Sequence, residues 1–212
     1  MIITDIPELD SELGGLPSGK VTTMIFDDVY LKNTIISNIV SSSLKSSGLT
    51  IYVDMDTIFS AYLDQGIVKM NNNENLILFT PEGYELDETF AKIFSIEPSE
   101  KDIIVIDSVT AFYHIQDEGV SFSTLNKKMG LYIFLLKDLV SKSGATVIIL
   151  SMMRSKQIRN EGSMKWFYSP SGGRVLEKAS DIIVSILKDE KICAMVMKHS
   201  NKEFVHRRIY FK

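Results

Sequence analysis

Apolar residues along the chain fall into two kinds of block. Continuous apolar blocks of about five to seven residues are typical of strands buried on both faces of a sheet, and they occupy residues 21–26, 50–54, 76–80, 102–107 and 145–151. Between them, apolar residues recur every three or four positions and predict helices, at residues 57–65, 86–94 and 125–143 and in a segment that ends near residue 45. Strands that alternate with helices predict an α/β fold, with a largely parallel sheet covered by helices on both faces.

The last third of the chain has a different pattern. Residues 154–173 are polar and predict a long loop, and residues 174–179 predict a short helix. Three consecutive strands are expected after it, at residues 181–187, 192–197 and 204–211, with a hairpin turn at the Lys-Asp-Glu-Lys of residues 188–191. Residues 1–20 contain paired glycines and a Pro-Ser-Gly turn, and predict a lead-in segment to the first strand. No repeat divides the 212 residues, which predict one domain over residues 1–212.

The composition, 45% hydrophobic and 24% charged, is that of a globular protein. No apolar run approaches the roughly 18 residues that a membrane span needs. The N-terminal residues lack the basic and apolar regions of a secretory signal, and the single cysteine, Cys193, excludes an internal disulfide. These features predict a cytoplasmic protein with no membrane partner.

Charge is distributed unevenly along the chain. Residues 1–150 hold ten basic and 21 acidic side chains, whereas residues 151–212 hold 13 basic and six acidic ones and all five arginines. A basic segment on an acidic protein favours a polyanionic partner. An internal charge asymmetry without a function is the alternative.

The connection after the first strand lies where a phosphate-binding P-loop would be. When Lys32 is placed on the lysine of the pattern G-x-x-x-x-G-K-[ST], the two glycines fall on Phe26 and Leu31 and the hydroxyl residue on Asn33, with Thr34 one position late. A degenerate nucleotide site would comprise Lys32, Asn33, Thr34 and Asp107.

The residues of this connection oppose phosphate binding. A P-loop wraps consecutive backbone N–H groups around the anion, and glycine permits that wrap because it has no Cβ. Asp27 and Asp28 would lie beside the phosphates, where each pair of like charges about 4 Å apart costs roughly 1 to 4 kcal/mol. We therefore expect no tight ATP binding, and no ATP or Mg²⁺ cofactor unless the degenerate loop still binds. The alternative for Lys32 is a solvated residue in an ordinary turn between a strand and a helix.

Carboxylates stand at the ends of two buried strands. Asp107 ends the apolar block at residues 102–107, where it could hold the water shell of a Mg²⁺ ion beside a nucleotide or simply cap the next segment. Asp54 and Asp56 end the second strand and point to one side, because side chains alternate along a strand. Asp56 would be either a general base toward water or part of a turn. The sequence leaves the alternatives open for Asp107 and for Asp56.

The stretch 154–174 is basic and aromatic. It holds five cations against one acid, Glu161, and its candidate DNA-binding residues are Arg154, Lys156, Arg159, Lys165, Trp166, Phe167, Tyr168 and Arg174. Cations follow a phosphate backbone while aromatic rings stack on bases, which favours single-stranded nucleic acid as the ligand. In the alternative, the aromatic triplet packs on the domain or on another subunit. The three histidines have no metal-ligand spacing, and no metal site is expected.

Several segments together resemble the RecA/RadA family of recombinases, and most closely its archaeal RadB-type paralogues, which consist of the core domain alone. The resemblance rests on the glycine-rich lead-in, on Tyr-Val-Asp-Met-Asp-Thr-Ile-Phe at residues 52–59, on Ile-Val-Ile-Asp-Ser-Val-Thr-Ala-Phe at residues 104–112, on Pro-Ser-Gly-Gly-Arg-Val-Leu at residues 170–176 and on Lys-His-Ser at residues 198–200. It implies a RecA-like P-loop ATPase core. It also places Asp107 on the Walker B carboxylate, Asp56 on the residue that activates water and residues 154–173 on the second DNA loop.

The departures from the family pattern concentrate on the residues that bind ATP. The P-loop glycines and hydroxyl residue are missing, and Asp56 replaces a glutamate. Ser151-Met152-Met153 stands where the family has Thr-Asn-Gln, Ser200 stands where the paralogues have arginine, and the acidic segment 117–124 lacks the arginine of the first DNA loop. The resemblance thus implies a protein with no ATPase activity or a vestigial one, with Asp56 and Asp107 as remnants of catalytic residues.

The sequence therefore predicts an accessory protein of DNA repair and homologous recombination. Single-stranded or branched DNA, a recombinase or another RecA-fold protein, and further copies of the chain are its expected partners. A KaiC-like signalling or scaffolding protein that acts through protein contacts alone is one alternative. A weak ATPase with an atypical P-loop is the other.

Overall fold

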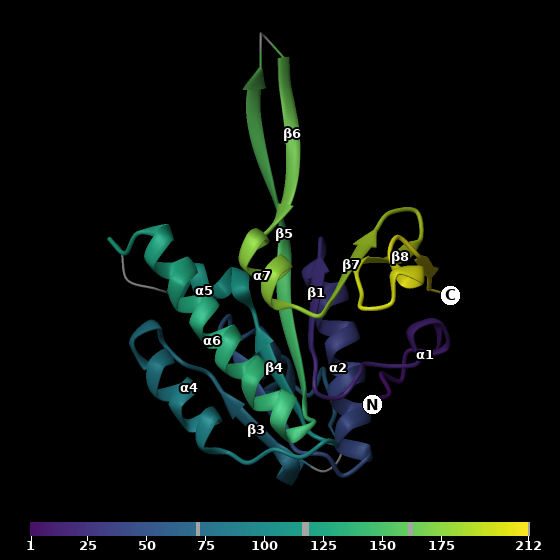
Figure 1. Ribbon diagram of the computed structural model, residues 1–212, viewed down its shortest axis with the longest axis vertical. Helices are drawn as coiled ribbons and strands as arrows, with labels where there is room; N and C mark the ends of the chain where they lie inside the picture. Colours follow the sequence, from purple (N-terminus) through teal and green to yellow (C-terminus); the bar gives the residue numbers. More distant parts are fainter. Residues whose placement is uncertain (71–72, 116–118, 161–162, 212) are drawn as a thin grey trace.

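A twisted nine-stranded sheet forms the centre of the protein, seen here in a computed structural model (Figure 1). The structure describes residues 1–70, 73–115, 119–160 and 163–211, with the backbone alone for residues 73 and 156–167. Eight strands follow the spatial order β3 (Leu76–Phe79), β2 (Thr50–Asp54), β4 (Ile103–Asp107), β5 (Thr146–Asn160), β1 (Val21–Phe26), β7 (Ile182–Lys188), β8 (Ile192–Lys198) and β9 (Arg208–Tyr210). The ninth, β6 (Ser163–Pro170), lies off this path and pairs with β5.

In this spatial order, the six strands from β3 to β7 are parallel to one another. Strands β8 and β9 continue the sheet in antiparallel pairing. This confirms the expected α/β class with a largely parallel sheet and antiparallel C-terminal strands. The continuous apolar blocks form its central strands because those strands are buried on both faces, as the burial of every residue of β1, β2 and β4 shows.

Helices cover both faces of the sheet. One face carries α1 (Pro7–Leu13), α2 (Val29–Lys45) and α3 (Ile58–Asp64), and the other carries α4 (Leu86–Ser95), α5 (Val109–Ile115), α6 (Phe122–Ser143) and α7 (Gly173–Ala179). Short 3₁₀ turns lie at Asn73–Asn75, Gly83–Glu85 and Lys202–Phe204. Alternation along β2 sends Tyr52 to the α2 face and Ile51 and Val53 to the α6 face, so two separate cores form.

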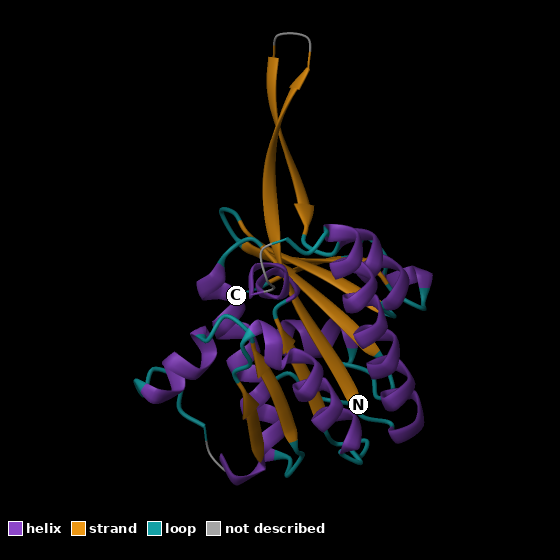
Figure 2. Cartoon of the chain, turned by 90° about the vertical axis from the view of Figure 1, so that its left-hand side faces the viewer, coloured by secondary structure: helices purple, strands orange, loops and turns teal. Residues whose placement is uncertain are grey.

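The segment expected to be a long loop is instead a two-stranded antiparallel ribbon. β5 runs on past the sheet to Asn160, and β6 (Ser163–Pro170) returns beside it, with Arg154 opposite Ser169. Figure 2 shows the ribbon projecting well beyond the body. A ribbon that stands clear of the body has no core to face, so it lacks the apolar blocks by which buried strands were recognised. The polar composition of the segment therefore predicted a loop wrongly.

Two smaller differences concern short elements. The strand expected at residues 204–211 is reduced to β9, preceded by the 3₁₀ turn at Lys202–Phe204. The seven-residue helix α5 was not expected, because it follows β4 after a single residue, Ser108, with no polar turn to mark its start. Within the described residues no helix combines the length and apolarity needed to cross a membrane.

Candidate functional site

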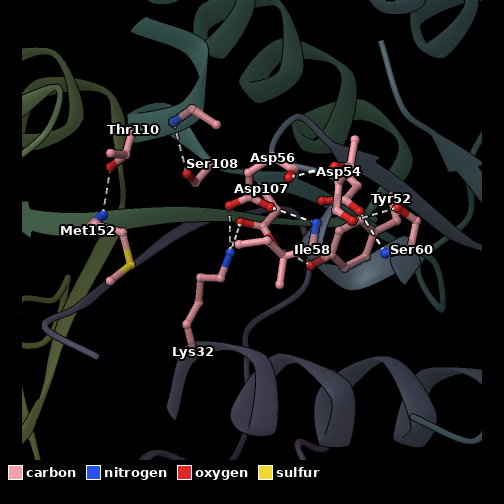
Figure 3. Close-up of polar contacts among 12 residues, drawn as sticks. Lys32, Tyr52, Asp54, Asp56, Ile58, Ser60, Asp107, Ser108, Thr110 and Met152 are labelled. Carbon is pink, nitrogen blue, oxygen red and sulfur yellow. Dashed lines mark hydrogen bonds and ion pairs between the residues drawn. The ribbon is translucent and has the colours of Figure 1, made fainter. Parts of the chain in front are cut away.

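The candidate site lies where the carboxyl ends of β2 and β4 meet the start of α2. Asp54 and Asp107 are paired across these two strands, and Asp56 follows two residues after Asp54. Lys32 reaches them from the first turn of α2 (Figure 3). In parallel sheets ligands bind outside the carboxyl ends of the strands, so this is the position at which a nucleotide site is expected.

The connection between β1 and α2 consists of Asp27 and Asp28 alone. The Asp28 carboxylate caps α2 by accepting a hydrogen bond of 2.7 Å from the backbone N–H of Leu31, which lowers the pKa of Asp28 below its usual range. Asp27 accepts hydrogen bonds of 3.0 and 3.1 Å from the backbone N–H of Lys188. The first N–H groups of a helix are natural donors to a phosphate, and here a carboxylate of the chain itself occupies one of them.

Lys32 points into the protein, and its side chain is only 1% exposed. Its Nζ lies 2.6 Å from Asp107 Oδ1 and 3.1 Å from Asp56 Oδ2. Burial by itself would lower the pKa of Lys32, but the charges of Asp107 and Asp56 outweigh burial and raise it. Lys32 is therefore a charged internal partner of these two carboxylates and not the solvated residue considered as the alternative.

Asp107 is bonded through both of its oxygens. Oδ1 accepts from Lys32, and Oδ2 accepts a hydrogen bond of 2.6 Å from the Tyr52 hydroxyl. Burial raises the pKa of Asp107, while the Lys32 ammonium acts in the opposite direction. Burial, followed by the negative charge of Asp107, raises the pKa of Tyr52 well above its usual value, so Tyr52 stays a donor. Tyr52 also stacks on Phe59, with ring centroids 4.1 Å apart, which fixes the hydroxyl in place.

Asp54 is the third carboxylate of the group and is fully buried. Its Oδ2 accepts a hydrogen bond of 2.7 Å from the backbone N–H of Ser60, and its Oδ1 has no partner among the described residues. Burial raises the pKa of Asp54 to about 7, and the negative charge of Asp107 adds to the rise. With three carboxyl groups around one lysine, a proton on Asp54 reduces the excess negative charge.

This raised pKa makes stability depend on pH. In the unfolded chain the Asp54 carboxyl loses its proton near pH 4, whereas in the folded chain it keeps the proton until about pH 7. The stabilisation of the folded state by Asp54 is therefore complete below pH 4 and is lost as pH rises through 7. The free energy of unfolding falls by up to about 4 kcal/mol over this range. We expect Asp54→Asn to remove this loss, so that urea unfolding between pH 5 and pH 8 gives a flatter profile than wild type. Asp138→Asn, at a half-exposed pair with Lys142, should leave the wild-type slope; equal slopes in all three proteins would contradict the assignment.

The geometry does not fit a magnesium-bound triphosphate. Oxygens of Asp54, Asp56 and Asp107 lie within 4.8 Å of one another, which is close enough for a shared metal ion. The Lys32 ammonium already pairs with both Asp56 and Asp107 at hydrogen-bond distance. In a working site, a P-loop lysine and a Walker B carboxylate bind the same nucleotide from separate positions. Here the corresponding residues pair directly with each other, and we call Lys32, Asp56 and Asp107 the charge cluster.

The four residues of the expected degenerate nucleotide site are not brought into one place. Lys32 and Asp107 are in contact, whereas Asn33 and Thr34 line a different cleft on the flank of α2. The Thr34 hydroxyl donates to the backbone carbonyl of Tyr30, 2.9 Å away, as an ordinary helical side chain does.

A second cleft, of about 410 Å³, lies at the base of the ribbon. It is lined by Arg154 and Arg174 together with Tyr113 and Phe122. Arg154 lies 3.1 Å from His114 Nε2 and 6.0 Å from the centre of the Tyr113 ring. Two arginines beside aromatic rings provide both a phosphate contact and a stacking surface.

The structure places three of the eight candidate DNA-binding side chains. Arg154 and Arg174 line the cleft at the base of the ribbon, and Tyr168, on β6, is 69% exposed. The other five, Lys156, Arg159, Lys165, Trp166 and Phe167, belong to the ribbon by their backbone pairing, and their side chains lie outside the described residues.

Sequence analysis missed one hydrogen-bond partner of the charge cluster and two residues of the cleft at the base of the ribbon. Tyr52 was assigned only to a buried strand, although a hydroxyl within an apolar block signals a buried hydrogen bond. Tyr113 precedes the acidic segment 117–124 and Phe122 lies within it, and two aromatic residues so close to an acidic segment were the available signal.

The strand order, the helices on both faces and the lysine–carboxylate group at the ends of β2 and β4 together define a RecA-like P-loop NTPase core. Comparison with a crystal structure of the RadB recombinase gives a TM-score of 0.72 at 21% identity over all of this chain and 96% of that one, which supports the fold.

Sequence comparison identifies relatives of the same kind. No protein-family model matches the chain. Protein RecA of Symbiobacterium thermophilum is 26% identical over 85% of this chain and 51% of its own length. The DNA repair and recombination protein RadB is 27% identical in Thermococcus onnurineus, over 72% of this chain and 69% of that protein, and 26% identical in Methanosphaera stadtmanae, over 95% and 89%. These similarities support membership of the RecA/RadB family, and the chain spans about half the length of the RecA proteins it matches.

Proposed function

We propose that this chain is an accessory protein of DNA repair and recombination that binds DNA through its ribbon and does not turn over ATP. Two of its relatives carry the name DNA repair and recombination protein RadB. The observation that carries the proposal is the pairing of Lys32 with Asp56 and Asp107, which engages the residues that a working ATPase needs for its nucleotide.

The loss of ATP turnover follows from two features of the site. Releasing Lys32 toward a phosphate would leave Asp107 buried with one fewer partner, at a cost of several kcal/mol. A triphosphate over the β1–α2 connection would also meet the carboxylates of Asp27 and Asp28. Phosphate release that exceeds background, and that Asp107→Asn abolishes, would instead support the alternative of a weak ATPase.

DNA binding rests on the charge and shape of the ribbon and its base. The ribbon stands clear of the body, so a strand of nucleic acid has access to it (Figure 2). Its sequence supplies Lys156, Arg159 and Lys165, and the cleft at its base adds Arg154 and Arg174. Cations spaced along an extended element suit the spacing of phosphates along a single strand, and the aromatic residues suit its bases.

Fluorescence of Trp166, the only tryptophan, tests DNA binding directly. We expect a single-stranded oligonucleotide to quench it at low salt, with an affinity that falls steeply as salt rises. The triple variant Lys156→Glu, Arg159→Glu and Lys165→Glu should bind at least tenfold more weakly. No quench at low salt in the wild type, and the same signal in the triple variant, would rule out DNA binding by the ribbon.

An exposed apolar face on α6 favours a second function, that of a scaffold acting through protein contacts. Leu131 is 55% exposed and Phe134 66%, and Leu135 lies beside them one helical turn from Leu131. Such a contiguous apolar face on a helix is typical of a protein interface. Sedimentation together with a recombinase, by a chain that has no affinity for DNA, would support this function over the first.

A further inference from the structure

A polar cleft on the flank of α2 belongs neither to the charge cluster nor to the ribbon. Its volume is about 280 Å³, and it lies between α2, α3 and the segment that follows α3. One wall of the cleft is a face of α2, with Asn33, Thr34, Ser37 and Asn38. The opposite wall includes Tyr62 of α3 and Lys69 of the segment that follows it. Residues 33, 34, 37 and 38 share a face because they are separated by three or four positions along the helix.

Two side chains in this cleft lack the hydrogen bonds that their burial demands. Asn33 is only 2% exposed, and neither its Nδ2 nor its Oδ1 has a partner among the described residues. The Ser37 hydroxyl, one turn further along, is also without a partner there. Buried polar atoms are nearly always paired in folded proteins, and a carboxamide with both ends unpaired is therefore a sign of a missing ligand or water.

The chemistry of the lining selects the class of ligand. A carboxamide offers a donor and an acceptor side by side, and its complement is another amide edge with an acceptor beside a donor. Tyr30 and Tyr62 lie at the cleft and provide faces for a planar ring. None of the described lining residues is acidic, and Lys69 is the one charged residue among them.

We propose that this cleft binds a small neutral ligand whose planar ring carries an amide edge, as in a lactam-type nucleobase, through Asn33 and Ser37. The inference does not depend on DNA binding, and it concerns a different surface from the ribbon.

Calorimetric titration of the intact chain without DNA tests the proposal. Inosine is the probe, and purine riboside is its matched control, because the two have the same sugar and ring system and purine riboside lacks the C=O and N–H of the amide edge. We expect inosine to bind at least tenfold more tightly than purine riboside. No binding of inosine at 10 mM (about the weakest affinity worth assigning to such a site), or equal affinities for the two nucleosides, would overturn the proposal and leave Asn33 to water alone.

Variants locate the binding. Asn33→Leu removes both polar atoms at similar volume and should reduce inosine affinity at least tenfold without lowering the unfolding temperature of the free protein. Ser37→Ala should reduce affinity severalfold, and provides the same test should Asn33→Leu fail to fold. Asn126→Ala, an asparagine at the base of the ribbon, is the control and should bind inosine as wild type does. Unchanged affinity in Asn33→Leu and Ser37→Ala would contradict this location.

Discussion

Replacing Lys32 by methionine is expected to destabilise the protein by about 3–5 kcal/mol. Methionine keeps the length of the side chain and removes the ammonium that lies 2.6 Å from Asp107 and 3.1 Å from Asp56. Lys32 is the one cation paired with Asp107 among the described residues, and a buried carboxylate that loses such a partner carries the full cost of its desolvation. Urea unfolding at pH 7 measures the loss.

Two further variants separate this effect from a general cost of mutating a lysine. Lys45→Met removes a surface pair with Asp5 and should change stability by less than about 1 kcal/mol. The double variant Lys32→Met and Asp107→Asn removes both charges of the buried pair and should recover part of the loss, since breaking a pair costs more than removing it. Stability unchanged by Lys32→Met would mean that Lys32 is free to serve a ligand, as in a working P-loop.

Removing the ribbon is expected to reduce DNA affinity about 10- to 100-fold while the body stays folded. Arg154 and Ser169 are paired across the ribbon, so residues 155–168 can be replaced by Asn-Gly, the sequence that favours a two-residue hairpin turn. The deletion removes Lys156, Arg159 and Lys165. If each contacts one phosphate of a single strand, the slope of log affinity against log salt should fall by about 2.

A charge-matched control distinguishes the ribbon from net charge. The deletion removes three cations and one acid, and Lys92→Glu on α4 changes the net charge by the same amount. Lys92 pairs with Glu88 on the body of the protein, away from the ribbon. We expect Lys92→Glu to bind DNA nearly as tightly as wild type. Equal losses in both variants would show that overall charge, and no particular surface, governs the interaction.

The body of the fold could be predicted from the sequence because its strands are buried on both faces. Each central strand is a continuous apolar block with a polar boundary, and the blocks alternate with amphipathic helices such as α6. The ribbon could not be predicted in this way. Its two strands pair only with each other beyond the sheet, so no buried face imposed an apolar pattern on residues 154–170.

The residues of the charge cluster could be predicted, but their pairing could not. Asp56, Asp107 and Lys32 each stood out from their positions at the ends of strands and at the start of a helix. Their partnership joins residues 24 and 75 positions apart, and it depends on the direction in which Lys32 turns. Nothing local in the sequence distinguishes a lysine that faces a ligand from one that faces a carboxylate of its own chain. The role of Tyr52 as a donor to Asp107 has the same long-range origin.

The cleft beside α2 shows a similar limit. Asn33 was considered only as a substitute for the hydroxyl residue of a P-loop, in line with Lys32. On the helix, however, neighbouring residues point about 100° apart, so Lys32 contacts the carboxylates while Asn33 lines the cleft that Tyr62 and Ser37 also line. Adjacent positions in a motif therefore serve two separate surfaces here.

Calorimetric titration with ATP and magnesium tests the central claim, that Lys32 belongs to an internal charge cluster and not to a nucleotide site. The account predicts no binding heat for ATP at millimolar concentration, in the wild type and in Asp107→Asn alike. Saturable ATP binding in the wild type that Asp107→Asn or Lys32→Met abolishes would contradict it.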